Sequence, residues 1–137
     1  MFFTKVATSV SGLAGFISYF ATSIVLLFLF AKIYERVTPY REFELIRQGN
    51  TAAACSFGGA LLGFAVPLAS AIAHSAGLLD MIIWGIIALV VQVLTFYAVQ
   101  KIFPGIVADI PANQVSKGVF LGIVSLAAGI LNAACMT

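Results

Sequence analysis

Residues 46–58, IRQGNTAAACSFG, decide the architecture, because a related segment, IPANQVSKGVFLG, returns 64 residues later at 110–122. Each copy follows a proline, Pro39 or Pro104, and a long apolar run precedes each proline. The positions that correspond include Ile46 and Ile110, Ala52 and Ser116, Ala54 and Gly118, and Gly58 and Gly122. A repeat sets the whole architecture of a chain, so we expect one structural unit used twice.

The composition is that of a membrane protein. Hydrophobic residues make up 62% of the 137 residues and charged residues 9%, whereas soluble domains carry about 25% charged residues. This length accommodates about four membrane helices of roughly 20 residues each. We therefore expect a single transmembrane domain over 1–137, with repeat one at about 12–73 and repeat two at about 81–137. The net charge of +2 is too small and too scattered to favour nucleic-acid binding.

Four apolar runs predict the spans, at 12–31, 51–73, 81–99 and 115–135. Their only Asp, Glu, Lys or Arg residue is Lys117, which lies near the end of a run, where its stem can reach the interface. The runs are continuously apolar and do not alternate as barrel strands do. The predicted fold class is an all-α membrane protein, with four transmembrane helices arranged as two parallel-oriented two-helix repeats.

The distribution of basic residues predicts the orientation. Six of the seven Lys and Arg residues fall on one side of the membrane if the chain crosses four times, and Lys5 is the exception. The positive-inside rule places that side in the cytoplasm and both termini on the periplasmic side. Because each repeat holds an even number of spans, the halves should be related by an axis along the membrane normal.

The charged connection at 32–47 predicts a short interfacial helix, with Thr38 as its N-cap and Pro39 as its first residue. Whether the segment 39–50 is a separate helix or continues into the second span stays open at this point. The segment is either a contact for a cytoplasmic partner or a linker on the membrane surface. The candidate partner contacts are Arg41, Glu42, Glu44 and Arg47.

Small residues at four-residue spacing predict the helix packing, because close backbone approach is a principal source of helix attraction in a bilayer. We expect the second and fourth spans to meet near the pseudo-axis through these residues. A chain of this size is too small to enclose a wide path alone, so a homo-oligomer or a membrane-complex partner is expected. The packing residues are Ala54, Gly58, Gly59, Gly63, Gly118, Gly122, Ser125 and Gly129.

The spans lack Asp, Glu and Arg at their midplanes, which disfavours ion-coupled transport by this chain alone. Their polar residues predict either interhelical hydrogen bonds or a narrow pore lined by neutral groups. These residues are Ser56, Ser70, Gln92, Ser125 and Asn132. Aromatic residues near the predicted span ends are typical of interfacial anchors. They are Tyr34, Tyr40, Trp84, Tyr97 and Phe103.

No catalytic set is present in the sequence, and we expect no enzyme activity, cofactor or metal. His74 and Asp80 lie close together, but one His and one carboxylate do not form a metal site. Nor does the sequence hold a phosphate loop, a G-x-S-x-G elbow or an H-E-x-x-H motif.

Taken together, Gly49-Asn50, the small residues at 52–63, Trp84-Gly85 and the tail at 129–136 resemble the YjfL-type family of bacterial inner-membrane proteins. The resemblance covers nearly the whole chain. It implies two tandem helix pairs and an inner-membrane location, and it supplies no catalytic residues. The second repeat departs from Gly49-Asn50 with Asn113-Gln114, so the two copies need not do identical work.

Two functional hypotheses follow. The first is an oligomeric, channel-like or permeation-related membrane protein, favoured by the repeated glycine-faced spans. The second is a non-conducting membrane subunit that anchors or regulates a cytoplasmic partner through 32–47. The lipid bilayer surrounds the chain in both.

Overall fold

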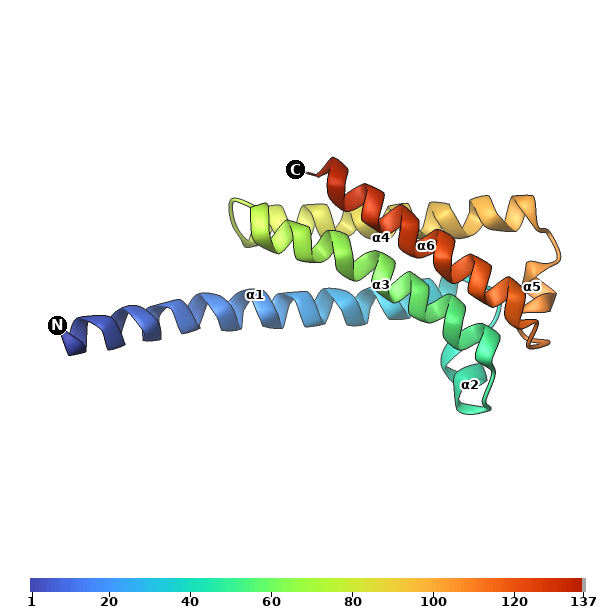
Figure 1. The fold of residues 1–137 in the computed structure, drawn as a ribbon, viewed down its shortest axis with the longest axis horizontal. Coiled ribbons are helices and arrows are strands. Elements are labelled where there is room, and N and C mark those ends of the chain that lie inside the picture. The colour runs from blue at the N-terminus through green and yellow to red at the C-terminus, as the bar shows by residue number, and fades with distance from the viewer. Residues whose placement is uncertain (137) are drawn as a thin grey trace.

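The structure is a computed structural model that describes residues 1–136, and every regular element in that range is helical. Four long helices are apolar enough to cross a membrane, so the prediction of an all-helical fold with four candidate spans is confirmed. Two short helices lie in the connections, together at one end of the bundle (Figure 1). The elements are α1 (Phe2–Val37), α2 (Glu42–Arg47), α3 (Thr51–His74), α4 (Leu78–Ile102), α5 (Ile106–Asp109) and α6 (Val115–Cys135). We call the end that carries α2 and α5 the basic end.

The connection between α1 and α3 differs from the sequence prediction. Thr38 is the C-cap of α1, with its backbone N–H donating to Tyr34, and the short helix begins only at Glu42. The predicted N-cap at Thr38 is therefore wrong, because α1 continues through the charged residues up to Val37. The chain then breaks at Gly49, whose φ is +86°. Thus α2 is separate from α3.

Both connections end in the same backbone conformation. Gly49 has a φ of +86° and Asn113 a φ of +61°. After each of them, the next N–H reaches back five residues, from Asn50 to the Leu45 carbonyl at 2.9 Å and from Gln114 to the Asp109 carbonyl at 3.0 Å. A left-handed residue followed by such a bond is a common helix ending, and Asn tolerates this region better than most residues. The Asn113 substitution therefore preserves the turn.

Helices α3 and α6 run side by side in the same direction (Figure 1). A Cβ atom added at Gly59 would overlap the backbone of Gly122, and one added at Gly129 would overlap Gly63. Added Cβ atoms at Gly118 and Gly63 would likewise meet the opposite backbone, at Ala52 and Ser125 respectively. This close approach leaves room only for hydrogen atoms at these positions, and it gains dispersion contact between the two backbones.

Two of the predicted packing residues lie outside this contact. Ala54 is exposed, and a Cβ atom added at Gly58 would meet nothing within 4 Å. The reason is helical rotation, since Gly58 is one residue, or about 100°, away from Gly59. The face of α3 that meets α6 is therefore not the repeat counterpart of the α6 face formed by Gly118 and Gly122.

Asparagine side chains join the two halves at the basic end. Asn50 caps α3 by accepting the Ala53 N–H at 2.8 Å, and its Nδ2 donates to the carbonyls of Ile110 at 3.0 Å and Pro111 at 3.2 Å. Asn113 Oδ1 accepts the Ala52 N–H at 3.0 Å. The first turn of α3 is thus capped from both halves of the chain, which satisfies N–H groups that a helix start leaves without partners.

Helix α1 packs on the bundle only through its C-terminal half. Phe30 stacks on Phe64 with ring centroids 4.5 Å apart, and Tyr34 contacts the rings of Phe57 and Phe96. Residues 1–18 are all exposed, and this part of α1 extends beyond the other helices (Figure 1). At 1.5 Å per residue, a helix of 36 residues is about 54 Å long, well beyond the roughly 30 Å hydrocarbon core.

Two of the predicted interfacial anchors lie in the core of the chain instead. Tyr34 and Tyr40 are buried in the chain, where their rings fill the space between α1 and α4 at the basic end. Tyr97 and Phe103 are exposed and Trp84 is half-buried.

Candidate functional site

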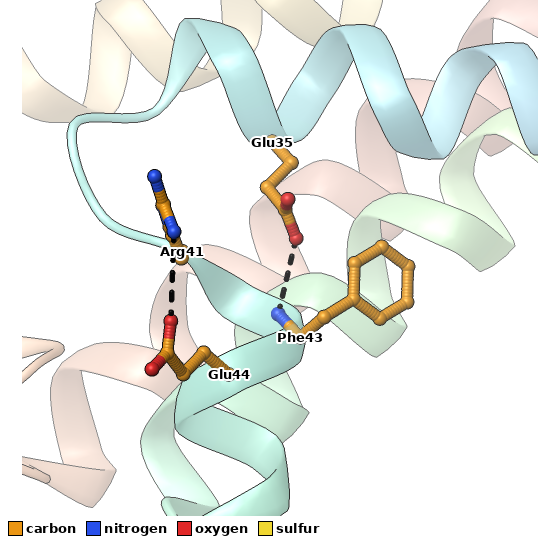
Figure 2. Close-up of polar contacts among 4 residues, drawn as sticks. All are labelled: Glu35, Arg41, Phe43 and Glu44. Atoms are coloured by element: carbon orange, nitrogen blue, oxygen red, sulfur yellow. Dashed lines mark hydrogen bonds and ion pairs between the residues drawn. The ribbon is translucent and has the colours of Figure 1, made fainter.

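The predicted partner-contact residues separate into exposed and buried members. Arg41, Glu44 and Arg47 are exposed, and Arg41 Nη1 lies 3.8 Å from Glu44 Oε2. Figure 2 shows this ion pair beside Glu35, whose carboxylate accepts the Phe43 N–H at 3.2 Å and so ties α2 to α1. Exposed pairs of this kind stabilise a fold by at most about 1 kcal/mol. Their charges remain accessible to a partner.

Glu42 is the buried member, with only 1% of its surface exposed. The prediction that Glu42 is a surface contact is therefore wrong, because its side chain is buried against Thr38. The Thr38 hydroxyl lies against Glu42 Oε1 and has the Tyr40 carbonyl, at 3.1 Å, as an alternative acceptor. The second oxygen, Oε2, is buried without a hydrogen-bond partner.

Burial governs the ionisation of this carboxyl. Loss of solvent raises the pKa of Glu42 to about 8. The nearby Glu35 also raises this pKa, and the hydrogen bond from Thr38 lowers it. Burial, together with the Glu42 charge, also raises the pKa of the Tyr40 hydroxyl. The Glu42 carboxyl therefore holds its proton at neutral pH and gives it up in mildly alkaline surroundings.

A second polar group lies at the centre of the bundle. Gln92 is fully buried, and its Nε2 donates to the Ser125 carbonyl at 3.0 Å. Ser125 is the middle residue of the 21-residue α6. Neither Gln92 Oε1 nor Ser125 Oγ has a hydrogen-bond partner among the described residues. The same holds for the hydroxyl of Tyr34, which lies near Ser125.

Unpartnered polar atoms continue toward the opposite end of the bundle. Asn132 follows Ser125 by seven residues, two helical turns or about 10 Å along the same face of α6. Asn132 Nδ2 and Ser75 Oγ are both buried without a partner. We call this series of side chains the polar seam. It consists of Tyr34, Gln92, Ser125, Asn132 and Ser75.

The seam atoms are of the kind that buried water satisfies. A buried polar atom left without a partner costs roughly 1–3 kcal/mol, and buried water commonly satisfies such atoms. A cavity of about 20 Å³ lies at the far end, lined by residues that include Ser75, His74 and Asp80. That volume accommodates about one water molecule. The seam side chains are neutral, so they suit water or a small neutral group better than a bare ion.

The remaining polar residues in the predicted spans have partners. Ser56 Oγ donates to the Ala53 carbonyl at 3.1 Å, and Ser70 Oγ donates across to the Ala133 carbonyl at 3.4 Å. Ser70 therefore forms the kind of interhelical bond that the sequence predicted. Within residues 1–136, no group of three or more His, Cys, Asp or Glu side chains is placed to hold a metal ion.

Sequence reasoning placed Gln92, Ser125 and Asn132 inside the spans but missed the part that Tyr34 and Glu42 play. Tyr34 was predicted to be an interfacial anchor and Glu42 a surface charge. A four-residue spacing between Thr38 and Glu42 was the only local signal. It carries little information, because Thr38 lies outside α2 and the contact depends on a turn.

Comparisons with known proteins agree over nearly the whole chain. Residues 8–136 match DUF350, a domain of unknown function. The chain is 41% identical over 125 residues to the UPF0719 inner membrane protein YjfL of Escherichia coli K12, covering 91% of this chain and 95% of the relative. It is 32% identical over 87 residues to the UPF0719 transmembrane protein YshE of Bacillus subtilis strain 168, covering 64% and 65% respectively. No solved structure matches the chain.

Proposed function

The chain belongs to the DUF350 family, and from this premise we propose that it is an oligomeric inner-membrane protein with a permeation-related role. The observation that carries the proposal is the unpartnered Oε1 of Gln92, a fully buried side chain at mid-span. A membrane helix that only needed packing would place apolar groups here, since each unpartnered atom costs free energy. Water held at this level would give a small solute a polar route across the hydrocarbon core.

The proposed architecture is a doubled unit. The matching left-handed residues Gly49 and Asn113 support a tandem repeat with both helix pairs in the same orientation. The short helix α2 would lie at the cytoplasmic interface, since the basic end carries most of the Lys and Arg residues. Assembly of several copies is supported by the size of the chain, since four long helices are too few to enclose a wide path.

Flux through proteoliposomes tests the role. Purified protein should release small solutes or ions faster than protein-free vesicles, and Gln92→Leu should remove most of that flux by replacing the mid-span polar group with an apolar one. Gln100→Leu is the matched control, because it makes the same change in the same helix at the basic end. Absence of flux for every probe with the wild-type protein would contradict the proposal, whatever the variants do. Native mass spectrometry would give the number of copies.

The alternative function is a non-conducting subunit that binds a cytoplasmic partner through α2. It is favoured by the exposure of the Arg41 side chain, 82%, and by the position of α2 outside the four-helix bundle (Figure 1). Double charge reversal, Arg41→Glu with Arg47→Glu, should abolish recovery of a partner in detergent pull-downs. Lys101→Glu reverses a charge at the same end outside α2 and should leave recovery unchanged. Equal recovery by wild type and double variant rules out this role.

A further inference from the structure

We propose that the permeant is the proton, and that the buried carboxyl of Glu42 is its binding site at the basic end of the polar seam. The inference rests on the proposed permeation role and names its substrate.

The first step concerns charge. A buried carboxylate needs a counter-charge, yet the ion pairs of residues 1–136 are Arg41 with Glu44 and Lys117 with Asp109. No Lys, Arg or His side chain of these residues therefore forms an ion pair with Glu42. With no cation paired to it, the negative charge of the Glu42 carboxylate is neutralised by binding a proton.

The second step concerns the other groups that face this carboxyl. From α1 they are Glu35 and Tyr34, and from the following turn Tyr40. Glu35 is acidic, and the two phenols are uncharged at neutral pH. Helix α3, which packs against α2, has one titratable side chain in its first half, Cys55, whose backbone lies against Gly122 of α6. None of these neighbours carries a positive charge that would favour the ionised form of Glu42 over the protonated form.

The third step is the route. The Tyr34 and Tyr40 rings both contact the Phe96 ring, Tyr40 and Glu42 share the Thr38 hydroxyl as a donor, and the Tyr34 hydroxyl lies near Ser125. A hydroxyl both donates and accepts, so it can pass a proton without net change. Beyond it, the seam offers Gln92 and Ser125 at mid-span and then Asn132. The cavity beside Ser75, with room for about one water, adjoins His74 and Asp80 at the opposite end.

The proton balance is simple. A hydronium ion at the basic end protonates the Glu42 carboxylate and leaves water. The carboxyl then releases its proton to a water beside Tyr34, and each following hydroxyl or water accepts one proton and donates one, while the Gln92 and Asn132 amides only hydrogen-bond these waters. No electron is transferred and no covalent bond other than O–H changes. One proton leaves the basic end for every proton delivered at the opposite end.

The size of the route favours a proton over a metal cation. Glu42 has one oxygen left after its contact with Thr38, whereas dehydrated cations need several oxygen ligands at once. The far cavity, with space for about one water, is too small for a hydrated ion.

The test measures proton uptake into proteoliposomes that contain a pH-sensitive dye, driven by a potassium diffusion potential. Wild type should acidify the lumen, and Glu42→Gln should reduce the initial rate at least tenfold because the amide cannot exchange a proton. Glu42→Asp should retain part of the rate. Glu44→Gln is the matched control, two residues away on the exposed side of α2, and should leave the rate unchanged. Elution volume and thermal unfolding in detergent check that every variant is folded.

A second readout detects the site without transport. Infrared spectra of wild type should contain a protonated-carboxyl band that disappears as pH rises through about 8, and this band should be missing from Glu42→Gln. Proton flux or a band that is unchanged in folded Glu42→Gln overturns this inference while leaving the permeation role intact. Wild-type flux of solutes or alkali ions without proton flux also overturns it. Failure of all flux in wild type overturns both.

Discussion

At the scale of single residues, Asn50 connects the two halves of the chain. Its side chain caps α3 through the Ala53 N–H and donates to two carbonyls after α5, at Ile110 and Pro111. The sequence is compatible with the cap, because Asn is favoured at that position. It did not predict the bonds to the second half, since they depend on how two segments about 60 residues apart meet in space.

Replacing Asn50 should destabilise the bundle. Asn50→Ala removes the cap and both bonds to the second half, at an expected cost of about 1–3 kcal/mol. Asn50→Ser retains a capping oxygen but cannot reach across, so its cost should be intermediate. Thermal unfolding in detergent measures both, with Gln48→Ala as the control at an exposed amide. Equal midpoints for Asn50→Ala and the control would contradict this account.

Glu42 should make stability depend on pH. Its pKa is about 8 in the folded chain and about 4.3 when unfolded, so the folded state binds more protons between these values. Its contribution to stability is therefore fully present below about pH 4 and is lost as pH rises through about 8.

Unfolding midpoints between pH 5.5 and 8.5 measure this loss. Wild type should fall over that range, Glu42→Gln should fall less steeply, and Glu44→Gln should follow wild type. Identical slopes for wild type and Glu42→Gln would show that Glu42 does not carry the dependence.

At the scale of elements, the contact between α3 and α6 shows how far a pattern can be read. Small residues recur at four-residue spacing along both helices, which is enough to nominate the pair. The pattern does not choose between two neighbouring stripes on α3, one through Ala54 and Gly58 and the other through Gly59 and Gly63. The choice depends on how α4 and α1 pack against the other faces of α3. The residues that determine this packing lie outside the α3 sequence.

Adjacent glycines in α3 should therefore respond in opposite ways. Gly59→Ala places a methyl group against the Gly122 backbone and should cost about 1–3 kcal/mol through overpacking. Gly58→Ala meets open space and should be neutral or stabilising by up to about 1 kcal/mol, because Ala is the better helix former. Unfolding midpoints of the two variants in detergent make the comparison. Loss of stability at Gly58 equal to that at Gly59 would contradict the packing.

At the scale of the whole molecule, four apolar runs were sufficient to predict the spans, because a membrane helix must satisfy its backbone internally over a fixed thickness. The extra length of α1 was less predictable. It has no charged residue from Val6 to Ala31, so hydropathy alone does not show where along α1 the bundle ends. Packing marks it, since burial in α1 begins only at Tyr19.

Thiol labelling should reveal the orientation of this molecule. Cys135 is exposed at the end of α6, and Cys55 is half-buried near the start of α3. With the basic end in the cytoplasm, a membrane-impermeant reagent should label Cys135 from the periplasmic side of spheroplasts. Cys135→Ser should abolish that labelling. Labelling of Cys135 only after the inner membrane is opened would reverse the orientation.

The backbone contact between α3 and α6 also constrains the order of events during synthesis. Gly59 and Gly122 are 63 residues apart in the chain, which corresponds to roughly 3–13 s at about 5–20 residues per second. Throughout that interval the glycine face of α3 lacks the α6 backbone that covers it in the folded chain. The newly inserted first half is therefore an incomplete product, and a ribosome that stalls before the fourth helix would leave in the membrane a species whose α3 glycine face is uncovered.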